Sequence, residues 1–476
     1  MPKASKMGLF GLIRMMKMRL KSYIGDRAFY KRTLAIAIPM IIQNAVTNLV
    51  NLLDNLMVGS LGTEQMSGVA IVNQFIFVFN LAIFGAVSGA GIFTAQFNGR
   101  GDTKGVRDTL RIKLILGLII GVIGVAVIGL FGHGLIGGFL HEGTEGNLEL
   151  TLEAGERYLS YIIIGLIPFA ISQVYASTLR ETGETVVPMI ASVASIVTNF
   201  VFNGLLIFGL FGLPALGVVG AAIATSLSRF VELAILLIYT HSKKEKCPFA
   251  VDLFKNFTVP MSLVKQVAMK GTPILLNEMF WSLSITTINQ CYSTRGLDVV
   301  AATNIAFTLQ NLLSVSYFAL SSSIAIIVGN LLGAGKLDEA KDTDRKLLAF
   351  SVFMGFIMMG MQIVISPFFP YLYNTTDAVR ELSTYIMICF GCTMPMAALA
   401  TATYYTIRSG GRVFITMLFD SVYAWVIVMP VVAALAYFTD LPFRYMLPIV
   451  LVVENLKLVP GLILVNKGIW LRQLKV

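Results

Sequence analysis

The sequence has few charged residues and few of the residues that commonly hold metals. Only 13% of its 476 residues are Asp, Glu, Lys or Arg, whereas a soluble globular protein carries about 25%. It has three His and four Cys residues, and His133, His141 and His241 show no metal-ligand spacing. Cys389 and Cys392 form a C-x-x-C pair inside an apolar stretch, so we interpret them as packing residues and not as a redox motif.

A phosphate-binding loop is also missing. The segment GAGK at 333–336 resembles one, but Asn330 stands where the first Gly belongs, and Leu337 stands where Ser or Thr belongs. We therefore expect no nucleotide site, no cofactor and no catalytic residues, and we predict that the protein is not an enzyme.

Long apolar stretches make up most of the chain. Hydrophobic residues account for 56% of it and the mean hydropathy is +0.78. The stretches do not alternate every second residue, as the strands of a membrane β-barrel would. They predict an all-α polytopic membrane protein with twelve transmembrane helices, over 33–58, 66–93, 112–132, 156–179, 186–210, 215–239, 266–292, 299–329, 345–369, 378–407, 412–438 and 441–466.

The net charge is +10. The basic residues are placed as membrane topology requires, so this charge does not indicate nucleic-acid binding. Basic residues precede the first span and recur on every second loop, whereas the loop at 133–155 carries four Glu residues and no Lys or Arg. The positive-inside rule then predicts a protein of the cytoplasmic membrane with both termini in the cytoplasm. Residues 1–32 read as a basic amphipathic surface helix, and residues 241–265 and 467–476 as a cytoplasmic loop and tail.

The two halves of the chain repeat each other. Pro39 precedes Gly99 by 60 residues, and Pro273 precedes Gly333 by the same number. Each half has six spans, so both have the same orientation, related by a pseudo-two-fold axis along the membrane normal. We predict an N-terminal six-helix lobe over 33–240 and a C-terminal lobe over 266–466, an arrangement suited to alternating access.

The first span carries a polar stripe with one acidic residue, Asp54. At about 100° per residue, its polar side chains fall within an arc of about 140°, so this face should meet protein or a water-filled cavity. An ionisable residue inside a membrane helix indicates function by default; the alternative is a structural aspartate near the helix end. We predict that the cavity is lined by Gln43, Asn44, Thr47, Asn48 and Asn51, with Asn277 and Trp281 from the seventh span.

Several segments together resemble the multidrug and toxic compound extrusion (MATE) family. They are IPMIIQN and NLLDNLMVGSLG in the first span, AQFNGRGD at 95–102, LRETGE at 179–184 and GVVGAAIATSLSR at 217–229. The resemblance covers nearly everything from about 33 to 470. It implies a secondary exporter driven by sodium or protons, built as a V-shaped pair of six-helix lobes with cytoplasmic termini.

The resemblance also implies a cation site in the N-terminal lobe, at Asp54, Asn199, Asn203 and Thr225. Some members of the family have Asp at the position of Asn203. Without it, the site has one carboxylate and several neutral oxygens. Such a site could hold sodium at Asp54, or Asp54 alone could take up a proton. The alternative for Asn199 and Asn203 is hydrogen bonding between helices.

Other charged residues are harder to assign. Glu278 and Asp420 form a candidate second site for a cation or substrate, although the family pattern places the partner acid on the tenth span; a structural role is equally open. Arg229 and Glu232 lie three residues apart, as do Glu454 and Lys457. That spacing predicts two structural or gating charge pairs.

We therefore predict a cation-coupled antiporter, driven by sodium or protons, that exports amphipathic, cationic drugs or metabolites. It would act as a monomer in the lipid bilayer on small-molecule substrates. A flippase for lipid-linked oligosaccharides is the closest alternative, but should need several intramembrane Lys or Arg residues. A membrane-embedded enzyme is a more distant one.

Overall fold

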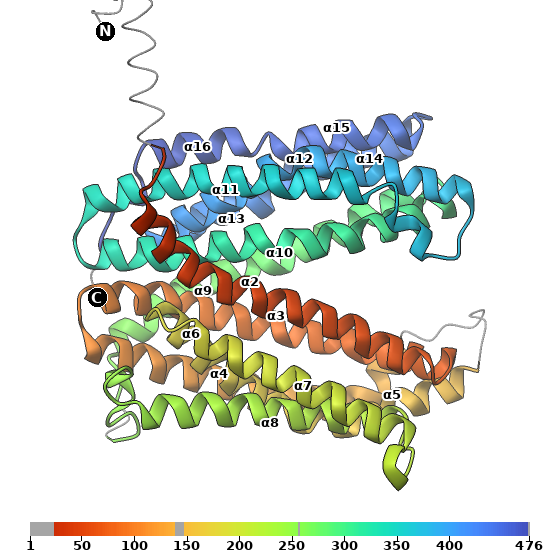
Figure 1. Cartoon of the computed structure of the whole chain (residues 1–476), viewed down its shortest axis with the longest axis horizontal. Helices are drawn as coiled ribbons and strands as arrows, with labels where there is room; N and C mark the ends of the chain where they lie inside the picture. Colours follow the sequence, from red (N-terminus) through yellow and green to blue (C-terminus); the bar gives the residue numbers. More distant parts are fainter. Residues whose placement is uncertain (1–22, 139–146, 256–257, 475–476) are drawn as a thin grey trace, which may run out of the picture. The chain divides into compact units, whose positions relative to one another are not determined.

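The computed structural model describes residues 23–138, 147–255 and 258–474, and these ranges contain helices and no strand. The amphipathic helix predicted for the N-terminus lies mostly outside them. The long helices are drawn in Figure 1. They are α2 (Arg27–Gly59), α3 (Thr63–Gly99), α4 (Thr103–Gly137), α5 (Leu148–Ile162), α6 (Leu166–Glu181), α7 (Val186–Phe208), α8 (Val218–Ser242), α9 (Met261–Ser293), α10 (Leu297–Gly333), α11 (Leu337–Ile365), α12 (Asp377–Ser409), α13 (Val413–Met417), α14 (Met429–Phe438), α15 (Phe443–Asn455) and α16 (Leu458–Asn466).

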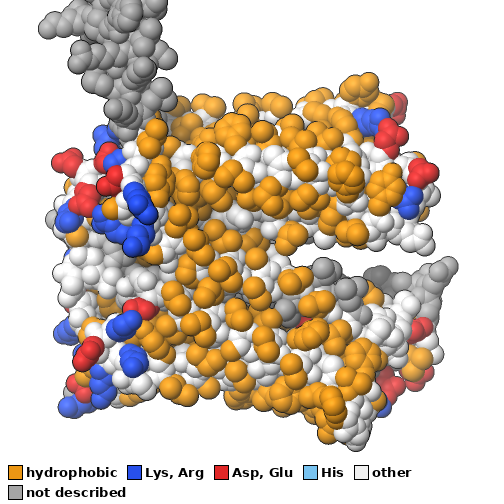
Figure 2. Space-filling view, in the orientation of Figure 1, with side chains coloured by type: hydrophobic (Ala, Val, Ile, Leu, Met, Phe, Trp, Pro, Cys, Tyr) orange, Lys and Arg blue, Asp and Glu red, His pale blue; other side chains and the backbone are white. Residues whose placement is uncertain are grey.

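Ten helical segments of the described chain are long and apolar enough to cross a membrane. Three of them are jointed, combining α5 with α6, α13 with α14, and α15 with α16. The helices α2 and α9, each of 33 residues, complete the twelve predicted segments. In each unit of the molecule, hydrophobic side chains cover the length of the helices and charged side chains gather at their ends (Figure 2). The prediction of an all-α polytopic membrane protein is confirmed.

Three helices begin eight or nine residues before the predicted starts. The third span was expected at 112 and α4 begins at Thr103; the fourth was expected at 156 and α5 begins at Leu148; the ninth was expected at 345 and α11 begins at Leu337. In α4 the Asp102 side chain accepts a hydrogen bond from the Gly105 backbone N–H, which is the usual role of an N-cap. These polar first turns extend beyond the apolar run, so hydropathy alone misses them.

The chain divides into two compact units. The N-terminal unit runs from Pro39 to Met279, and the C-terminal unit contains Phe280–Leu474 together with the described residues up to Ile38. Both divisions fall inside a helix, α2 or α9, whereas the sequence places the lobe boundaries at 240 and 266. Each of these helices therefore contributes its first part to one unit and its second part to the other.

The units share local geometry at matching positions. Pro39 lies inside α2 and Pro273 inside α9, and α3 and α10 are both 37 residues long. The turns after α3 and α10 each contain a glycine with positive φ, Gly101 at 73° and Gly335 at 75°, a conformation that favours glycine. The sequence repeat is thus also a repeat of helix lengths and turns.

Close helix packing holds the N-terminal unit together. A Cβ on Gly89 of α3 would collide with the backbone of Gly271, so these glycines let α3 approach the first half of α9, as small residues do in membrane bundles. Arg111 of α4 donates to the backbone carbonyls of Asp252, Leu253 and Lys255 at 2.8–2.9 Å. These bonds fix the long loop between α8 and α9 to the unit.

The C-terminal unit has its own apolar core. Residues of α10, α12, α14 and α15 form one cluster, including Ile386, Met394 and Leu447, which are fully buried. A second cluster at the end of the unit includes Trp470, whose side chain is 1% exposed. Tyr30 from the start of α2 packs edge-on against Phe350 of α11, with ring centroids 5.2 Å apart.

Candidate cation site and cavity in the N-terminal unit

Three helices of the N-terminal unit, α2, α7 and α8, form a small polar cluster around Asp54. Asp54 comes from the end of α2, and its carboxylate accepts a hydrogen bond from the amide of Asn203 on α7. Asn199, one turn earlier on α7, lies 3.0 Å from the hydroxyl of Thr225 on α8. With its amide turned to satisfy its neighbours, the Asn199 nitrogen lies 2.8 and 3.3 Å from the two Asp54 oxygens. The structure thus places all four residues of the predicted N-terminal cation site in one cluster.

The cluster offers oxygen atoms suited to a hard monovalent cation. Asn199 and Asn203 are 4% and 1% exposed. The side-chain oxygen of Asn203 is buried and has no hydrogen-bond partner within the described ranges. A buried carbonyl oxygen without a partner is costly, and a cation beside Asp54 would satisfy it. No three His, Cys, Asp or Glu residues of the described chain converge as a transition-metal site would require.

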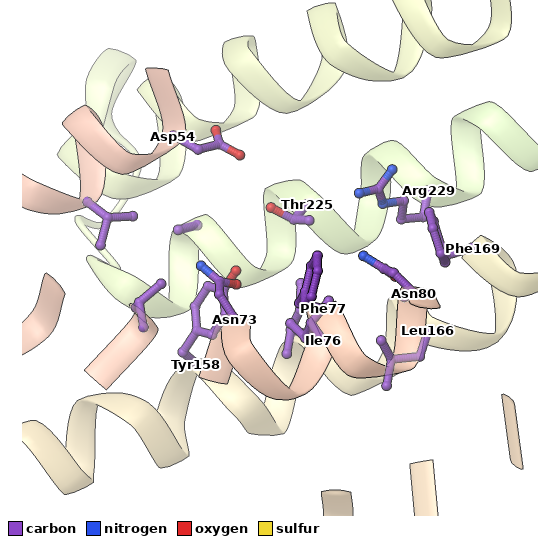
Figure 3. Close-up of a pocket in the computed structure, with 15 residues that line it drawn as sticks. Asp54, Asn73, Ile76, Phe77, Asn80, Tyr158, Leu166, Phe169, Thr225 and Arg229 are labelled. Atoms are coloured by element: carbon purple, nitrogen blue, oxygen red, sulfur yellow. The ribbon is translucent and has the colours of Figure 1, made fainter. Parts of the chain in front are cut away.

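A cavity of about 320 Å³ opens beside Asp54 (Figure 3). Thr225 and Arg229 of α8 lie on one side, and Asn73, Phe77 and Asn80 of α3 lie opposite them. The remaining lining comes from α2, α3, α5, α6, α8 and the link between α5 and α6, with residues Asp54, Val58, Val69, Ile76, Tyr158, Ile162, Gly165, Leu166, Phe169 and Ala221. The cavity therefore combines a carboxylate, a guanidinium, two amides and aromatic rings.

Sequence reasoning missed the α3 face of this cavity. Asn73, Phe77 and Asn80 are spaced by four and three residues, so they share one helix face. Two amides at that spacing inside an otherwise apolar span were a usable signal. Tyr158 and Phe169 gave no comparable signal, since aromatic residues are common throughout the chain.

The charge pair predicted on α8 forms. Arg229 Nη1 lies 3.6 Å from Glu232 Oε2, and the guanidinium stacks on the Phe169 ring at 4.7 Å from its centroid. Glu232 is 3% exposed, and its other oxygen accepts a hydrogen bond from Ser192 at 3.0 Å. A carboxylate this deeply buried needs both a cation and hydrogen bonds.

The described lining of this cavity includes none of the residues predicted to line one from α2, nor Asn277 or Trp281 of α9. Their cavity-lining role stays a prediction. Gln43 is buried at 9% exposure and donates to Ser192 at 2.7 Å, because it lies one turn after Pro39, where α2 packs on α7. Asn44, Thr47 and Asn48 are exposed in the structure, and the Asn51 side chain lies outside the described residues. Asn277 is buried and Trp281 is 37% exposed.

The charged residues of the C-terminal unit pair differently from the prediction. Lys457 Nζ lies 2.9 Å from Asp420 Oδ1, and the described residues show no ion pair between Lys457 and Glu454. The expected pair required a continuous helix, but α15 ends at Asn455 and α16 begins at Leu458. Asp420 lies in a π-helical stretch, Leu418–Val422. Glu278 is half-buried and belongs to the N-terminal unit, so a shared site with Asp420 stays a prediction.

Comparison with known proteins identifies the family. The MatE family model matches residues 39–205 and 273–434, which is one match in each half of the chain. The chain belongs to the MatE family. Membership places this MatE protein among membrane transporters and not among enzymes.

The relatives and solved structures cover most of this MatE protein. It is 29% identical over 333 residues to a probable multidrug resistance protein NorM of Thermotoga maritima, with 69% of each chain covered. It is 25% identical to a NorM protein of Halalkalibacterium halodurans, covering 87% of this chain and 89% of that one. Its fold matches an outward-facing multidrug resistance MATE transporter with a TM-score of 0.84 and 20% identity, covering 94% of this chain and 97% of the other. It matches a transporter from Pyrococcus furiosus with a TM-score of 0.80 and 19% identity.

Proposed function

We propose that this protein is a cation-coupled antiporter that exports amphipathic, cationic small molecules, and that Asp54 carries the coupling. The observation that carries the proposal is the Asp54 cluster. One carboxylate is surrounded by two buried amides and a hydroxyl, and it faces a cavity large enough for part of a small organic molecule. The names of its relatives, probable multidrug resistance proteins, support an export role.

The cluster supports coupling because one carboxylate serves two kinds of ligand. A sodium ion or a proton neutralises Asp54, whereas an ionised Asp54 attracts a cationic substrate into the cavity. Phe77, Phe169 and Tyr158 supply apolar and aromatic surface for such a substrate. The ion and the substrate shift the conformational equilibrium only as far as each binds one state better than the other.

A phosphate-carrying flippase fits the cavity less well. Its described lining contains one basic residue, Arg229, and this arginine is already paired with Glu232. A cavity for lipid-linked phosphates should present several such groups, because phosphate is recognised by clustered charge-assisted hydrogen bonds.

Transport assays with reconstituted protein test the proposal. A cationic fluorescent dye would be added to the solution outside inverted vesicles. Its uptake would be recorded under an imposed proton gradient and then under a sodium gradient. We expect one of the gradients to drive uptake and the Asp54→Asn variant to abolish it. Gradient-driven transport by Asp54→Asn at the wild-type rate would refute the coupling site.

We also propose that both termini face the cytoplasm, on the basis of the Lys and Arg distribution. Cysteines introduced one at a time within 243–265 and within 147–153 would be labelled with a membrane-impermeant reagent on intact cells. Labelling at 147–153 alone is the expected result. Labelling within 243–265 would contradict the proposed orientation.

A further inference from the structure

Arg229 shares a cavity with one carboxylate, Asp54, and pairs with another, Glu232. It lines the cavity that contains Asp54, and it is close enough for its charge to interact with that of Asp54. On its other side it reaches Glu232, which is one turn further along α8. The Arg229 side chain is 35% exposed, so space remains for it to move.

The contact between Arg229 and Glu232 is loose. Their closest atoms are 3.6 Å apart, longer than a charge-assisted hydrogen bond of about 2.7–2.9 Å. Glu232 Oε2, the oxygen that faces Arg229, has no hydrogen-bond partner within the described part of the chain. The guanidinium is held from one face by the Phe169 ring, a contact that allows it to slide more readily than a bidentate bond would.

Other groups besides Arg229 stabilise the Glu232 carboxylate. The Ser192 hydroxyl donates to its Oε1 at 3.0 Å, and Ser192 itself accepts from Gln43 at 2.7 Å. Arg180 of α6 donates to Gln43 at 3.5 Å, and its charge also interacts with Glu232. The buried carboxylate therefore keeps a hydrogen bond and a second cation nearby.

We propose that Arg229 is a tethered cation that exchanges between Glu232 and Asp54 and competes with the coupling ion for Asp54. This inference rests on the proposed role of Asp54. When sodium or a proton neutralises Asp54, Arg229 pairs with Glu232, the arrangement seen in the structure. When the ion leaves, Arg229 moves toward the ionised Asp54 and balances its charge. Arg229 thus sets the ion affinity of the site and promotes ion release.

The exchange predicts opposite effects for two substitutions in one ion pair. Arg229→Gln removes the competitor, so the coupling ion should neutralise Asp54 at a lower concentration. Glu232→Gln keeps the hydrogen bond from Ser192 but releases Arg229 toward Asp54, so a higher ion concentration should be needed. A fixed ion pair would act on Asp54 only through its two opposite charges, so the two shifts would add and largely cancel in the double variant Arg229→Gln/Glu232→Gln.

The measurement is the concentration of sodium, or of protons, that half-neutralises Asp54. It would be followed on the full-length protein in nanodiscs as the carboxyl infrared band that disappears in Asp54→Asn. The other groups facing the two carboxylates are Tyr158 of α5 and Arg180 of α6, and they are unchanged in both variants. A neighbouring opposite charge alters carboxylate protonation by roughly tenfold to a thousandfold, so we expect a decrease of about tenfold for Arg229→Gln and a comparable increase for Glu232→Gln.

Further variants complete the design. Arg229→Lys keeps the charge and should remain near the wild-type midpoint, and the double variant Arg229→Gln/Glu232→Gln should behave like Arg229→Gln. Asp377→Asn disrupts an exposed pair with Arg380 at the same three-residue spacing in the C-terminal unit and should leave the midpoint unchanged. If Arg229→Gln does not fold, Glu232→Gln and Arg229→Lys still decide the question.

The outcomes separate the two proposals. If the wild-type protein shows no ion-dependent band that requires Asp54, the proposed function fails. If that band is present but the two single variants leave the midpoint unchanged or move it in the same direction, or the double variant returns to the wild-type midpoint, Arg229 is not a tethered competitor and the inference is overturned.

Discussion

Arg229 and Lys457 lie 228 residues apart, the separation that also relates Arg180 to Arg408. Each of the two units therefore places a basic residue at the same point of its last helical segment. In the N-terminal unit the basic residue pairs loosely with Glu232, at 3.6 Å, and shares a cavity with Asp54. In the C-terminal unit Lys457 pairs with Asp420 at 2.9 Å.

The position equivalent to Asp420 in the N-terminal unit is Ser192, which donates to Glu232. Both units thus place a carboxylate near the basic residue, but from different helices. The position that matches Asp54, by the offset between Pro39 and Pro273, is Ile288. The C-terminal unit therefore has no carboxylate at the position of Asp54, although the charge of Glu454 also interacts with that of Lys457. The two basic residues thus differ in the distance to their partners and in the helices that supply the surrounding carboxylates.

The largest effect should come from Asp54→Asn. The amide keeps the size and hydrogen bonding of the side chain, so the protein should insert and purify as the wild type does. It cannot release and rebind a cation, so gradient-driven dye transport should fall to the level of protein-free vesicles. The measurement is the initial rate per reconstituted transporter under the driving gradient.

Glu278→Gln tests whether the coupling chemistry is confined to the Asp54 cluster. By the repeat, Glu278 corresponds to Asn44, so its charge has no counterpart in α2. We expect a partial loss of export, smaller than that of Asp54→Asn, with an unchanged melting temperature. A fall in melting temperature together with activity would instead assign Glu278 a structural role.

Asn203→Ala and Asn199→Ala should sharpen the description of the cation site. Each removes one neutral group from Asp54 and leaves the carboxylate in place. If sodium is the coupling ion, the loss of a neutral oxygen ligand should raise the sodium concentration for half-maximal transport roughly tenfold, since hydrogen bonds and ligands to charged groups contribute about 1.5–3 kcal/mol. If protons are the coupling ion, the loss of an N–H donor to the carboxylate favours protonated Asp54, so the proton concentration needed should fall. If both variants show the same dependence on the ion gradient as the wild type, these amides only form hydrogen bonds between helices.

The smallest effect on transport is expected from Asp420→Asn. The substitution removes the charge that pairs with Lys457, so stability should fall. Because the two side chains are 17% and 19% exposed, we expect about 1–2 kcal/mol, below the 3–5 kcal/mol of a fully buried pair. Thermal unfolding in detergent measures it, and Asp420→Asn/Lys457→Met should recover part of the loss.

Transport per folded Asp420→Asn molecule should equal that of the wild type under either gradient. A selective loss of ion dependence in this variant would instead give the C-terminal unit a coupling role and break the contrast between the two units.

The sequence by itself determined the class of protein, the helices and the repeat. Hydropathy identifies membrane helices because each span must satisfy its own backbone in lipid. The constant offset between Pro39 and Pro273 reveals the repeat without any structure. Asp54 stands out because a carboxylate inside an apolar helix is costly, and the same face of α7 shows Asn199 and Asn203 one turn apart.

Tertiary structure alone decided which charges pair and what lines the cavity. The pair between Glu454 and Lys457 follows from helical spacing, yet a break at residues 456–457 removes it and brings Lys457 to Asp420. Gln43 belongs to the polar stripe of α2 but is buried against Ser192. Asn73 and Asn80 line the cavity from α3, opposite α8. These outcomes depend on contacts between residues far apart in the chain, which local periodicity does not encode.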